Sequence, residues 1–377
     1  MKILGLTVDD KLTFTEHIKL TSKKVQSLYR QLSTAAKLSW GLNPEIVRTI
    51  YVSVVEPIIL YAANVWAPAT RKKTTQKLLN RVQRGFAQKI VRAYRTVSLN
   101  AALTLAGLLP LDLRVQEVAH LYEIKKGHSQ RVLGDRDLER PTEYTKTQHP
   151  AHLEGLQFDC LTDGDEVAQR AAVDVRIYTD GSKIDGRVGA ALSIWDSVAE
   201  TSCRKLKLGN FCTVYQAELY ALYEAVKFVA RSPSKRFGIY SDSRSALESL
   251  KSVDCLHPLV GEIRERIGEC RKRGKEIKLF WIKAHVGVEG NERADILAKS
   301  AAVGVKTEPH YDKCPVSFVK RQLRLDSLDE WNRRYKEGIT ASTTRVFFPD
   351  AISAYPTLRK LELDPVLVQV LTGHGGF

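Results

Sequence analysis

Between residues 173 and 303, short apolar runs alternate with helical patterns, and this alternation constrains the fold more than any other feature of the sequence. Four runs have the length and apolar content of buried strands: AAVDVRIYTD, VGAALSIW, RFGIYSD and KEIKLFWIK. Helical patterns lie between them, and the one over 213–229 places Leu222, Ala225, Val226 and Val229 on a single face. Strands that alternate with helices predict an α/β domain with its own hydrophobic core.

Acidic residues stand at comparable places in four of these elements. Asp180 and Asp242 each end a strand before a turn, whereas Glu218 and Asp295 lie in the first turns of two helices. Because α/β sheets assemble their sites where strands end and helices begin, we expect the four carboxylates to meet. Taken singly, each has a plainer interpretation as a turn cap or a helix-terminal charge. The four together, in this order, favour a site.

A cluster of four carboxylates needs a cation, because the carboxylates would otherwise repel one another. An all-oxygen donor set favours Mg²⁺, with Mn²⁺ possible, and nothing in the sequence points to a small-molecule cofactor. Such clusters commonly hold two ions about 4 Å apart, which activate water and stabilise the leaving oxygen. His285, in the loop WIKAHVGVEGN, is expected to move protons or to help the product leave. An ordinary loop histidine is the plainer interpretation.

The charge of the chain indicates what such a site would act on. The formal net charge is +15, and residues 1–100 alone carry 17 Lys and Arg against 5 Asp and Glu. Cations that neutralise phosphates release condensed counterions, so a polyanionic partner is favoured. A basic surface that only keeps the chain soluble is the alternative. Together with the acidic site, the charge predicts a phosphodiester substrate.

The first hundred residues predict a short strand, KILGLTV, followed by helices over 15–38, 44–64 and 72–95. The third helix has apolar residues at helical spacing and an outward face that is strongly basic. That face either follows a phosphate backbone or is simply solvated. Its basic residues are Lys72, Lys73, Lys77, Arg81, Arg84, Lys89, Arg92 and Arg95.

Other features bear on the cellular setting. Six cysteines are scattered without a C-x-x-C pair, so we expect free thiols and neither structural zinc nor disulfides. No apolar run approaches the about 18 residues needed to cross a membrane. We therefore expect an intracellular protein, nuclear or cytoplasmic, without a membrane partner. The sequence leaves the oligomeric state open.

The acidic motifs resemble type 1 ribonuclease H. They are YTDGS, YQAEL, YSDSRSAL and WIKAHVGVEGNERADILAK, in that order. The resemblance implies a five-stranded mixed sheet flanked by helices, and endonucleolytic, metal-dependent cleavage of the RNA strand of RNA–DNA hybrids. It implies that four residues bind metal and are catalytic: Asp180, Glu218, Asp242 and Asp295. It adds His285 as the mobile catalytic histidine of the loop.

The resemblance also implies a substrate groove. Its contacts would come from Gly181, Ser182, Thr213, Gln216, Ser243 and Arg244. Two positions depart from the pattern of the cellular enzymes. Thr213 and the two residues after it replace an Asn-rich run, and Arg244 stands where Gln is common. Hybrid contacts in this chain are therefore expected to depend more on charge.

The flanking sequences resemble another family. MKILGLTVDDKLTFTEHI, EPIILYAANVWAP and WNRRYKEG resemble regions after the polymerase palm and around the nuclease domain of non-LTR retrotransposon reverse transcriptases. We thus expect a C-terminal fragment with a thumb-like helical segment over 1–130, a linker over 131–172, the ribonuclease H domain over 173–304, and a helical tail over 305–377. No palm or zinc knuckle is expected within it. The alternative is a non-catalytic, nucleic-acid-binding remnant.

Overall fold

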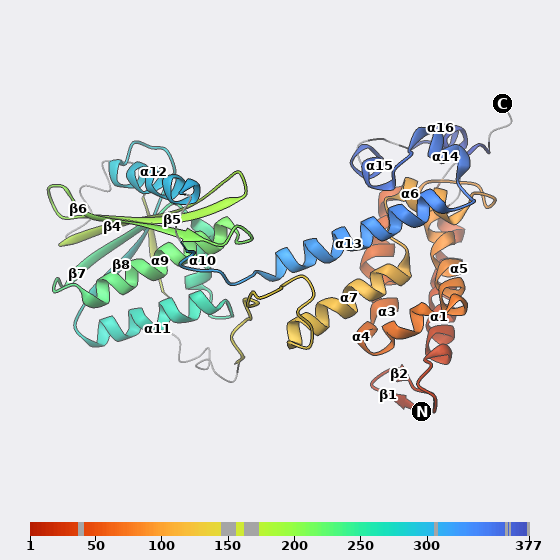
Figure 1. The fold of residues 1–377 in the computed structure, drawn as a ribbon, viewed down its shortest axis with the longest axis horizontal. Coiled ribbons are helices and arrows are strands. Elements are labelled where there is room, and N and C mark those ends of the chain that lie inside the picture. The colour runs from red at the N-terminus through yellow and green to blue at the C-terminus, as the bar shows by residue number, and fades with distance from the viewer. Residues whose placement is uncertain are drawn as a thin grey trace. The chain divides into compact units, whose positions relative to one another are not determined.

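The computed structural model describes residues 1–36, 41–144, 156–161, 173–304, 308–358, 361 and 363–374. The chain divides into two compact units, shown as a ribbon in Figure 1. Unit 1 comprises Met1–Val132 with Lys320–Phe377, and unit 2 comprises Leu133–Val319. Much of the predicted linker 131–172 lies outside the described residues. Residues 320–377 pack within unit 1, although the sequence suggested a separate tail.

A six-stranded mixed sheet forms the centre of unit 2, with the strand order β3-β8-β7-β4-β5-β6. Its strands are β3 (Phe158–Leu161), β4 (Val175–Ile184), β5 (Arg187–Trp195), β6 (Glu200–Leu208), β7 (Arg236–Ser241) and β8 (Glu276–Ile282). The neighbouring pairs β3–β8, β8–β7 and β7–β4 are parallel. The pairs β4–β5 and β5–β6 are antiparallel. The predicted α/β class is confirmed.

The predicted domain, 173–304, contains the five strands expected, β4 to β8, and the sixth strand, β3, lies outside it. Phe158–Leu161, inside the predicted linker, pairs in parallel with β8 and becomes an edge strand. A four-residue strand within a polar segment has too few apolar residues to show a period, which is why the sequence does not reveal it.

Helices cover both faces of this sheet, with α12 on one face and α9 and α11 on the other (Figure 1). The helices of unit 2 are α9 (Val214–Arg231), α10 (Arg244–Lys251), α11 (Pro258–Lys272) and α12 (Glu289–Val303). The approach of α12 to β5 is close, because a Cβ atom at Gly189 would lie 2.4 Å from the Ala298 carbonyl oxygen. This glycine therefore lets α12 lie flat on the sheet.

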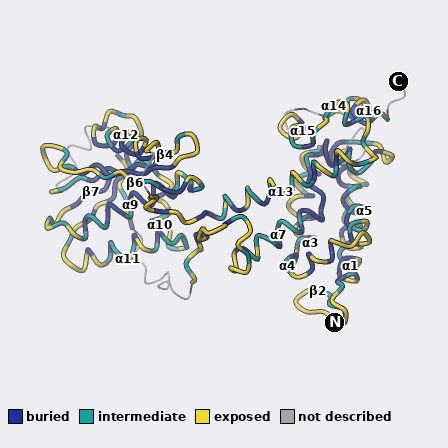
Figure 2. Tube along the Cα trace, in the orientation of Figure 1, coloured by how far each residue is buried: buried dark blue, intermediate teal, exposed yellow. Residues whose placement is uncertain are grey.

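Unit 1 is helical. Its helices are α1 (Thr15–Ala35), α2 (Pro44–Ile50), a π-helix (Tyr51–Val55), α3 (Glu56–Leu60), α4 (Ala63–Trp66), a 3₁₀ helix (Ala67–Arg71), α5 (Lys73–Ile90), α6 (Leu99–Ala106), α7 (Leu111–Lys126), α13 (Val316–Glu337, from Lys320 on), α14 (Ser342–Phe347), α15 (Ala351–Leu358) and α16 (Pro365–Thr372). Figure 2 shows that the buried residues of each unit lie on the inward sides of its elements.

Three predictions for unit 1 need correction. The KILGLTV segment is a hairpin of β1 (Lys2–Ile3) and β2 (Leu6–Thr7), because Leu4 and Gly5 turn the chain with φ of 47° and 86°. The helix expected over 44–64 is interrupted at Ala62, whose φ is 52°. The helix expected over 72–95 ends at Ile90. The last residues of the helix expected over 15–38 lie outside the described residues.

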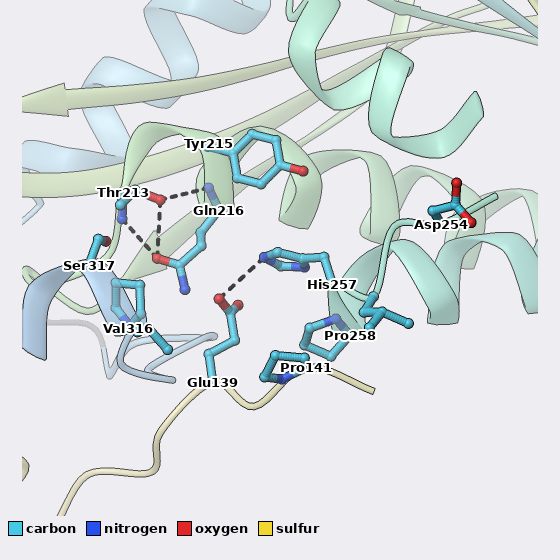
Figure 3. Close-up of a pocket in the computed structure, with 12 residues that line it drawn as sticks. Glu139, Pro141, Thr213, Tyr215, Gln216, Asp254, His257, Pro258, Val316 and Ser317 are labelled. Atoms are coloured by element: carbon cyan, nitrogen blue, oxygen red, sulfur yellow. Dashed lines mark hydrogen bonds and ion pairs between the residues drawn. The ribbon is translucent and has the colours of Figure 1, made fainter. Parts of the chain in front are cut away.

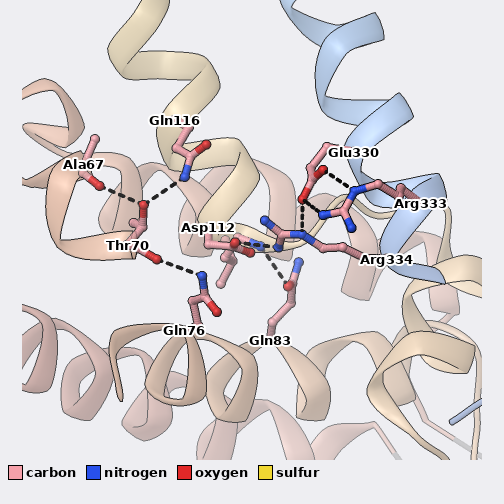
Figure 4. A network of polar contacts seen from close by, with 10 residues as sticks. Ala67, Thr70, Gln76, Gln83, Asp112, Gln116, Glu330, Arg333 and Arg334 are labelled. Atoms are coloured by element: carbon pink, nitrogen blue, oxygen red, sulfur yellow. Dashed lines mark hydrogen bonds and ion pairs between the residues drawn. The ribbon is translucent and has the colours of Figure 1, made fainter. Parts of the chain in front are cut away.

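A polar network centred on the buried Asp112 ties α7 to α13 in unit 1 (Figure 4). Asp112, 1% exposed, accepts a hydrogen bond of 2.7 Å from Nη1 of Arg334, and Nε of the same arginine donates to Glu330. Next to this network, the side-chain oxygen of Gln83 on α5 accepts a hydrogen bond of 3.0 Å from the backbone N–H of Leu111, the first residue of α7. Buried charges are stable only when paired in this way, so the network fixes how these helices pack.

Among the described residues, no single helix has the length and apolar content to cross a membrane. One pair of helical segments, Pro44–Leu60 and Ala63–Arg71, meets that test only when the two are taken together, and it is bent by 53°.

Candidate active site

Three carboxylates meet at one edge of the unit 2 sheet. Asp180 lies on β4, Asp242 follows β7, and Glu218 lies on α9, and each offers an oxygen within 4.8 Å of the others. The register explains the first two, because Thr179 of β4 pairs with Ser241 of the parallel strand β7. The next residues are the two aspartates. Asp242 follows the end of β7 as predicted, but Asp180 lies within β4, which continues to Ile184 and does not end at Asp180 as the sequence suggested. The structure thus brings together three of the four carboxylates expected to meet.

Glu218 reaches this edge because α9 begins nearby and packs closely against β4. The Thr213 hydroxyl oxygen accepts a hydrogen bond of 3.1 Å from the backbone N–H of Gln216. In return, the side-chain oxygen of Gln216 accepts one of 2.9 Å from the backbone N–H of Thr213. This capping box fixes the start of the helix, so that Glu218 falls in its second turn. A Cβ atom at Gly181 would lie 2.6 Å from the Glu218 amide nitrogen. Only glycine permits this approach.

The cluster is buried and electrostatically unbalanced. Asp180 is 7% exposed and Glu218 is 6% exposed. Burial, and then the charges of Asp242 and Asp295, raise the pKa of Asp180 to about 7. Burial, and then the charges of Asp180 and Asp242, raise the pKa of Glu218 well above its usual value. Burial also raises the pKa of Asp242, although a hydrogen bond from Asn291 opposes the effect.

Two buried oxygens of the cluster have no hydrogen-bond partner among the described residues, namely Asp180 Oδ2 and Glu218 Oε2. An unpaired carboxylate oxygen inside a protein is costly unless it binds a proton or a cation. Three clustered carboxylates, two of them with an unpartnered oxygen, match the donor set of a hard divalent cation. The residues at this site therefore fit such an ion.

Asp295, the fourth predicted carboxylate, is placed differently. It lies on α12, outside the group whose oxygens come within 4.8 Å of one another. Its Oδ2 accepts a hydrogen bond of 2.7 Å from Lys299 Nζ, one helical turn further along. Its charge still raises the pKa of both Asp180 and Asp242. Asp295 is thus near the cluster, with a lysine as its partner.

His285 lies in the turn between β8 and α12, exposed to solvent. Its φ is 57°, the left-handed conformation that non-glycine residues seldom adopt. The ring is near enough to interact electrostatically with the cluster, because a positive charge on it lowers the pKa of Asp242. The structure therefore places this histidine on a solvent-exposed turn within electrostatic reach of the cluster.

Two further residues contact Asp242 that the sequence did not single out. Asn291 Nδ2 donates to Asp242 Oδ2 at 3.4 Å, and Trp281 Nε1 donates to the Asp242 carbonyl oxygen at 3.0 Å. Asn291 is 4% exposed, and its own Oδ1 is buried without a partner among the described residues. The spacing carried a signal, because Asn291 stands one helical turn before Asp295 in GNERAD and so shares its face of the helix.

The predicted substrate contacts fall into two groups. Gly181 is buried beside Glu218, and Gln216 is 1% exposed, with its amide group donating to the Lys313 carbonyl oxygen at 3.2 Å. Ser182, Thr213 and Ser243 are half-buried. Gln216 is thus occupied by structural contacts, and the substrate roles of all these residues stay predictions.

Arg244, another predicted substrate contact, is exposed. Its guanidinium lies over the Trp281 ring, 5.8 Å from the ring centroid, and is 3.9 Å from Glu248. The same tryptophan donates a hydrogen bond to the Asp242 carbonyl oxygen. The Arg244 guanidinium therefore lies next to the carboxylate cluster. Its contact with substrate stays a prediction.

Comparisons with known proteins agree on unit 2. The RNase H family model matches residues 172–303. The chain is 31% identical over 126 residues to a putative 115 kDa protein in the type-1 retrotransposable element R1DM of Drosophila melanogaster, which covers 33% of this chain and 12% of that protein. It is 30% identical over 134 residues to a retrovirus-related Pol polyprotein from the type-1 retrotransposable element R1 4 of Nasonia vitripennis. That alignment covers 36% of this chain and 34% of the relative.

The chain therefore spans at most about a third of the length of these two curated relatives. Among solved structures, the N-terminal RNase H domain of rv2228c from Mycobacterium tuberculosis, determined as a fusion with maltose binding protein, is 20% identical with a TM-score of 0.30. That alignment covers 35% of this chain and 94% of the solved one.

Proposed function

Because residues 172–303 form a ribonuclease H domain in a retrotransposon pol-like chain, we propose that this protein hydrolyses the RNA strand of RNA–DNA hybrids with the help of divalent cations. The observation that carries the proposal is the buried cluster of Asp180, Glu218 and Asp242, with its two unpaired oxygens. A buried set of like charges is unfavourable by itself, which supports a cationic ligand at this site.

The chain's own residues divide the work. Asp180, Glu218 and Asp242 would hold Mg²⁺ or Mn²⁺, and Asp295 would add a carboxylate if it left Lys299. Bound ions would supply the charge that activates water and stabilises the leaving oxygen. Asn291 and Trp281 orient Asp242 through its side chain and its carbonyl oxygen.

Proton transfer and substrate binding would fall to exposed groups. His285 would accept or donate a proton at the attacking or leaving oxygen. The Arg244 guanidinium would contact a backbone phosphate beside the cluster. The 2′-hydroxyl is the feature by which a protein distinguishes the RNA strand from the DNA strand, so contacts to it would direct cleavage.

The test uses four substrates of one sequence: an RNA–DNA hybrid, duplex RNA, duplex DNA and single-stranded RNA. With Mg²⁺, we expect the wild-type chain to cut only the RNA strand of the hybrid. Asp180→Asn should reduce the rate by about a hundredfold or more, because it removes a charged ligand of the proposed metal site. Asp196→Asn is the matched control. Asp196 accepts from two backbone amides of the turn between β5 and β6, so this variant should keep its activity.

Equal cleavage by wild type and Asp180→Asn would contradict the proposal. Salt-sensitive binding of the hybrid by the wild type without any cleavage would favour the alternative, a non-catalytic nucleic-acid-binding remnant.

A further inference from the structure

Unit 2 extends beyond the ribonuclease H match on both sides, and the two extensions are joined to each other. We call residues 137–142 and 310–315 together the clasp. The Cys314 amide donates to the Asp137 carbonyl at 2.7 Å, and the Glu139 amide donates to the Cys314 carbonyl at 2.8 Å. These bonds form a parallel bridge between Leu138 and Cys314. Segments that flank the nuclease domain in the sequence therefore lie side by side in the fold.

The clasp is also bonded to the nuclease domain at separate places. The Gly209 amide donates to the Tyr311 carbonyl at 2.9 Å, which extends the end of β6. The Thr142 amide donates to the Leu256 carbonyl at 2.8 Å, just before α11. Backbone bonds of this kind anchor the clasp whatever its side chains are.

Glu139 lies at the centre of the clasp and is 8% exposed. Its Oε2 is 3.2 Å from His257 Nε2 (Figure 3). Its Oε1 accepts a hydrogen bond from the Tyr311 hydroxyl. Burial works to raise the pKa of Glu139, but hydrogen bonds and charge from His257, with further bonds from Tyr311 and Gln216, hold it below its usual value. Glu139 is thus a buried carboxylate with three separate partners.

Gln216 connects this cluster to the active site. Its amide group donates to the Lys313 carbonyl of the clasp at 3.2 Å, while its oxygen accepts from the Thr213 amide at 2.9 Å in the capping box of α9. Glu218 follows two residues later on the same helix. Any shift of Gln216 is therefore passed to the start of α9 and to Glu218.

A cavity of about 530 Å³ adjoins the same cluster (Figure 3). Glu139, Gln216 and His257 line it, together with Tyr215 and Pro141. Because side chains do not fill this space, polar contacts take a larger share in fixing the position of Gln216. These contacts are the Lys313 carbonyl of the clasp and the capping box of α9.

We propose that the clasp positions the start of α9, with Glu139 as the positioning residue, so that Glu218 stays within reach of Asp180 and Asp242. Its consequence for catalysis rests on the proposed nuclease function. Its direct consequence is for cation binding at the three carboxylates, and that can be measured without any substrate.

The test measures Mn²⁺ affinity of the full chain by titration calorimetry without nucleic acid, with the thermal midpoint recorded for each variant. Glu139→Ala should weaken Mn²⁺ binding by about tenfold, and Tyr311→Phe, which removes one hydroxyl, by about threefold. Glu139→Gln should restore most of the affinity, because an amide can still accept from Tyr311 and donate to His257. The matched control is Asp174→Asn, which breaks a 2.7 Å ion pair with Arg236 elsewhere in unit 2. Its Mn²⁺ affinity should not change.

Unchanged Mn²⁺ affinity in Glu139→Ala, with a lowered thermal midpoint, would overturn the proposal and leave the clasp a purely stabilising element. If Glu139→Ala does not fold, Tyr311→Phe decides by the same criterion. Equal weakening in Asp174→Asn would also overturn it. A wild type that binds Mn²⁺ but never cuts a hybrid would refute the nuclease function, while the comparison of affinities would still decide the role of the clasp.

Discussion

At the scale of single residues, the carboxylate cluster supplies the physical reason for the proposed cation. Burial and mutual repulsion raise the pKa values of Asp180, Glu218 and Asp242, and two of their oxygens have no partner among the described residues. The free chain therefore holds its site at a cost in folding free energy. Cation binding would remove that cost, which couples metal binding to the stability of unit 2.

This coupling predicts a pH dependence. The pKa of Asp180 is about 7 in the fold and near its ordinary value when unfolded, so the folded state binds the extra proton between about pH 4 and 7. Without metal, stability should fall as pH rises through this window, by at most about 1.4 kcal/mol per pH unit for one proton. Asp180→Asn cannot bind or release this proton. The unfolding free energy of the variant, relative to that of the wild type, should therefore increase from pH 5 to pH 8. Urea unfolding in a chelator measures both. A difference in unfolding free energy that is the same at the two pH values would rule this out.

At the scale of elements, one close contact sets the distance between β4 and α9. Gly181→Ala would place a Cβ atom 2.6 Å from the Glu218 amide, so the helix must move away. We expect lower stability and at least about tenfold weaker Mn²⁺ binding. Gly268→Ala on α11 is the matched control, because nothing lies within 4 Å of a Cβ atom there. It should be neutral or stabilising by up to about 1 kcal/mol. Normal Mn²⁺ affinity in Gly181→Ala would show that this contact does not set the geometry.

The elements also show how far the sequence could predict this fold. Apolar runs and helical periods identify β4, β5, β7, β8 and the four helices of unit 2, because those elements are buried on at least one full face. They do not identify β6, whose run ETSCRKLKL is polar and buries only Leu206 and Leu208, or the short edge strand β3. Asp242 after β7 and Glu218 near the start of α9 lie where the sequence predicted, whereas Asp180 lies within β4 and reaches the cluster through the parallel register of β4 with β7.

What the sequence could not supply were side-chain contacts between distant segments. The pairing of Asp295 with Lys299 depends on rotamers, although its helical spacing is visible. The contact of Glu139 with His257 joins positions more than a hundred residues apart, and no local pattern predicts it. The buried role of Gln216 follows from the same clasp.

At the scale of the whole molecule, the basic surplus of the first hundred residues belongs to unit 1, whereas the acidic cluster belongs to unit 2. On α5, Lys73, Lys77 and Arg81 are exposed at intervals of four residues and so form one stripe along the helix. Regularly spaced cations on one helix face suit the repeating charges of a phosphate backbone.

Replacing Lys73, Lys77 and Arg81 by Gln should weaken hybrid binding at low salt and reduce the slope of log affinity against log salt by about 2 to 3. Mn²⁺ affinity should not change. Arg333→Gln, which removes a guanidinium already bonded to Glu330 and Glu337, is the comparison and should leave the slope nearly unaltered. Fluorescence anisotropy of a labelled hybrid at several salt concentrations provides the slopes. An unchanged slope in the triple variant would mean that the stripe is only solvated.

The most direct test of the central claim is the single-turnover rate at which the full chain cleaves the RNA strand of a hybrid, measured across Mg²⁺ concentrations. We predict a rate that rises with Mg²⁺ to a plateau, vanishes in a chelator, and is lost in Asp180→Asn and Glu218→Gln at every Mg²⁺ concentration. Cleavage that persists in the chelator, or that survives in both variants at the wild-type rate, would contradict the claim that these carboxylates hold the ions for the reaction.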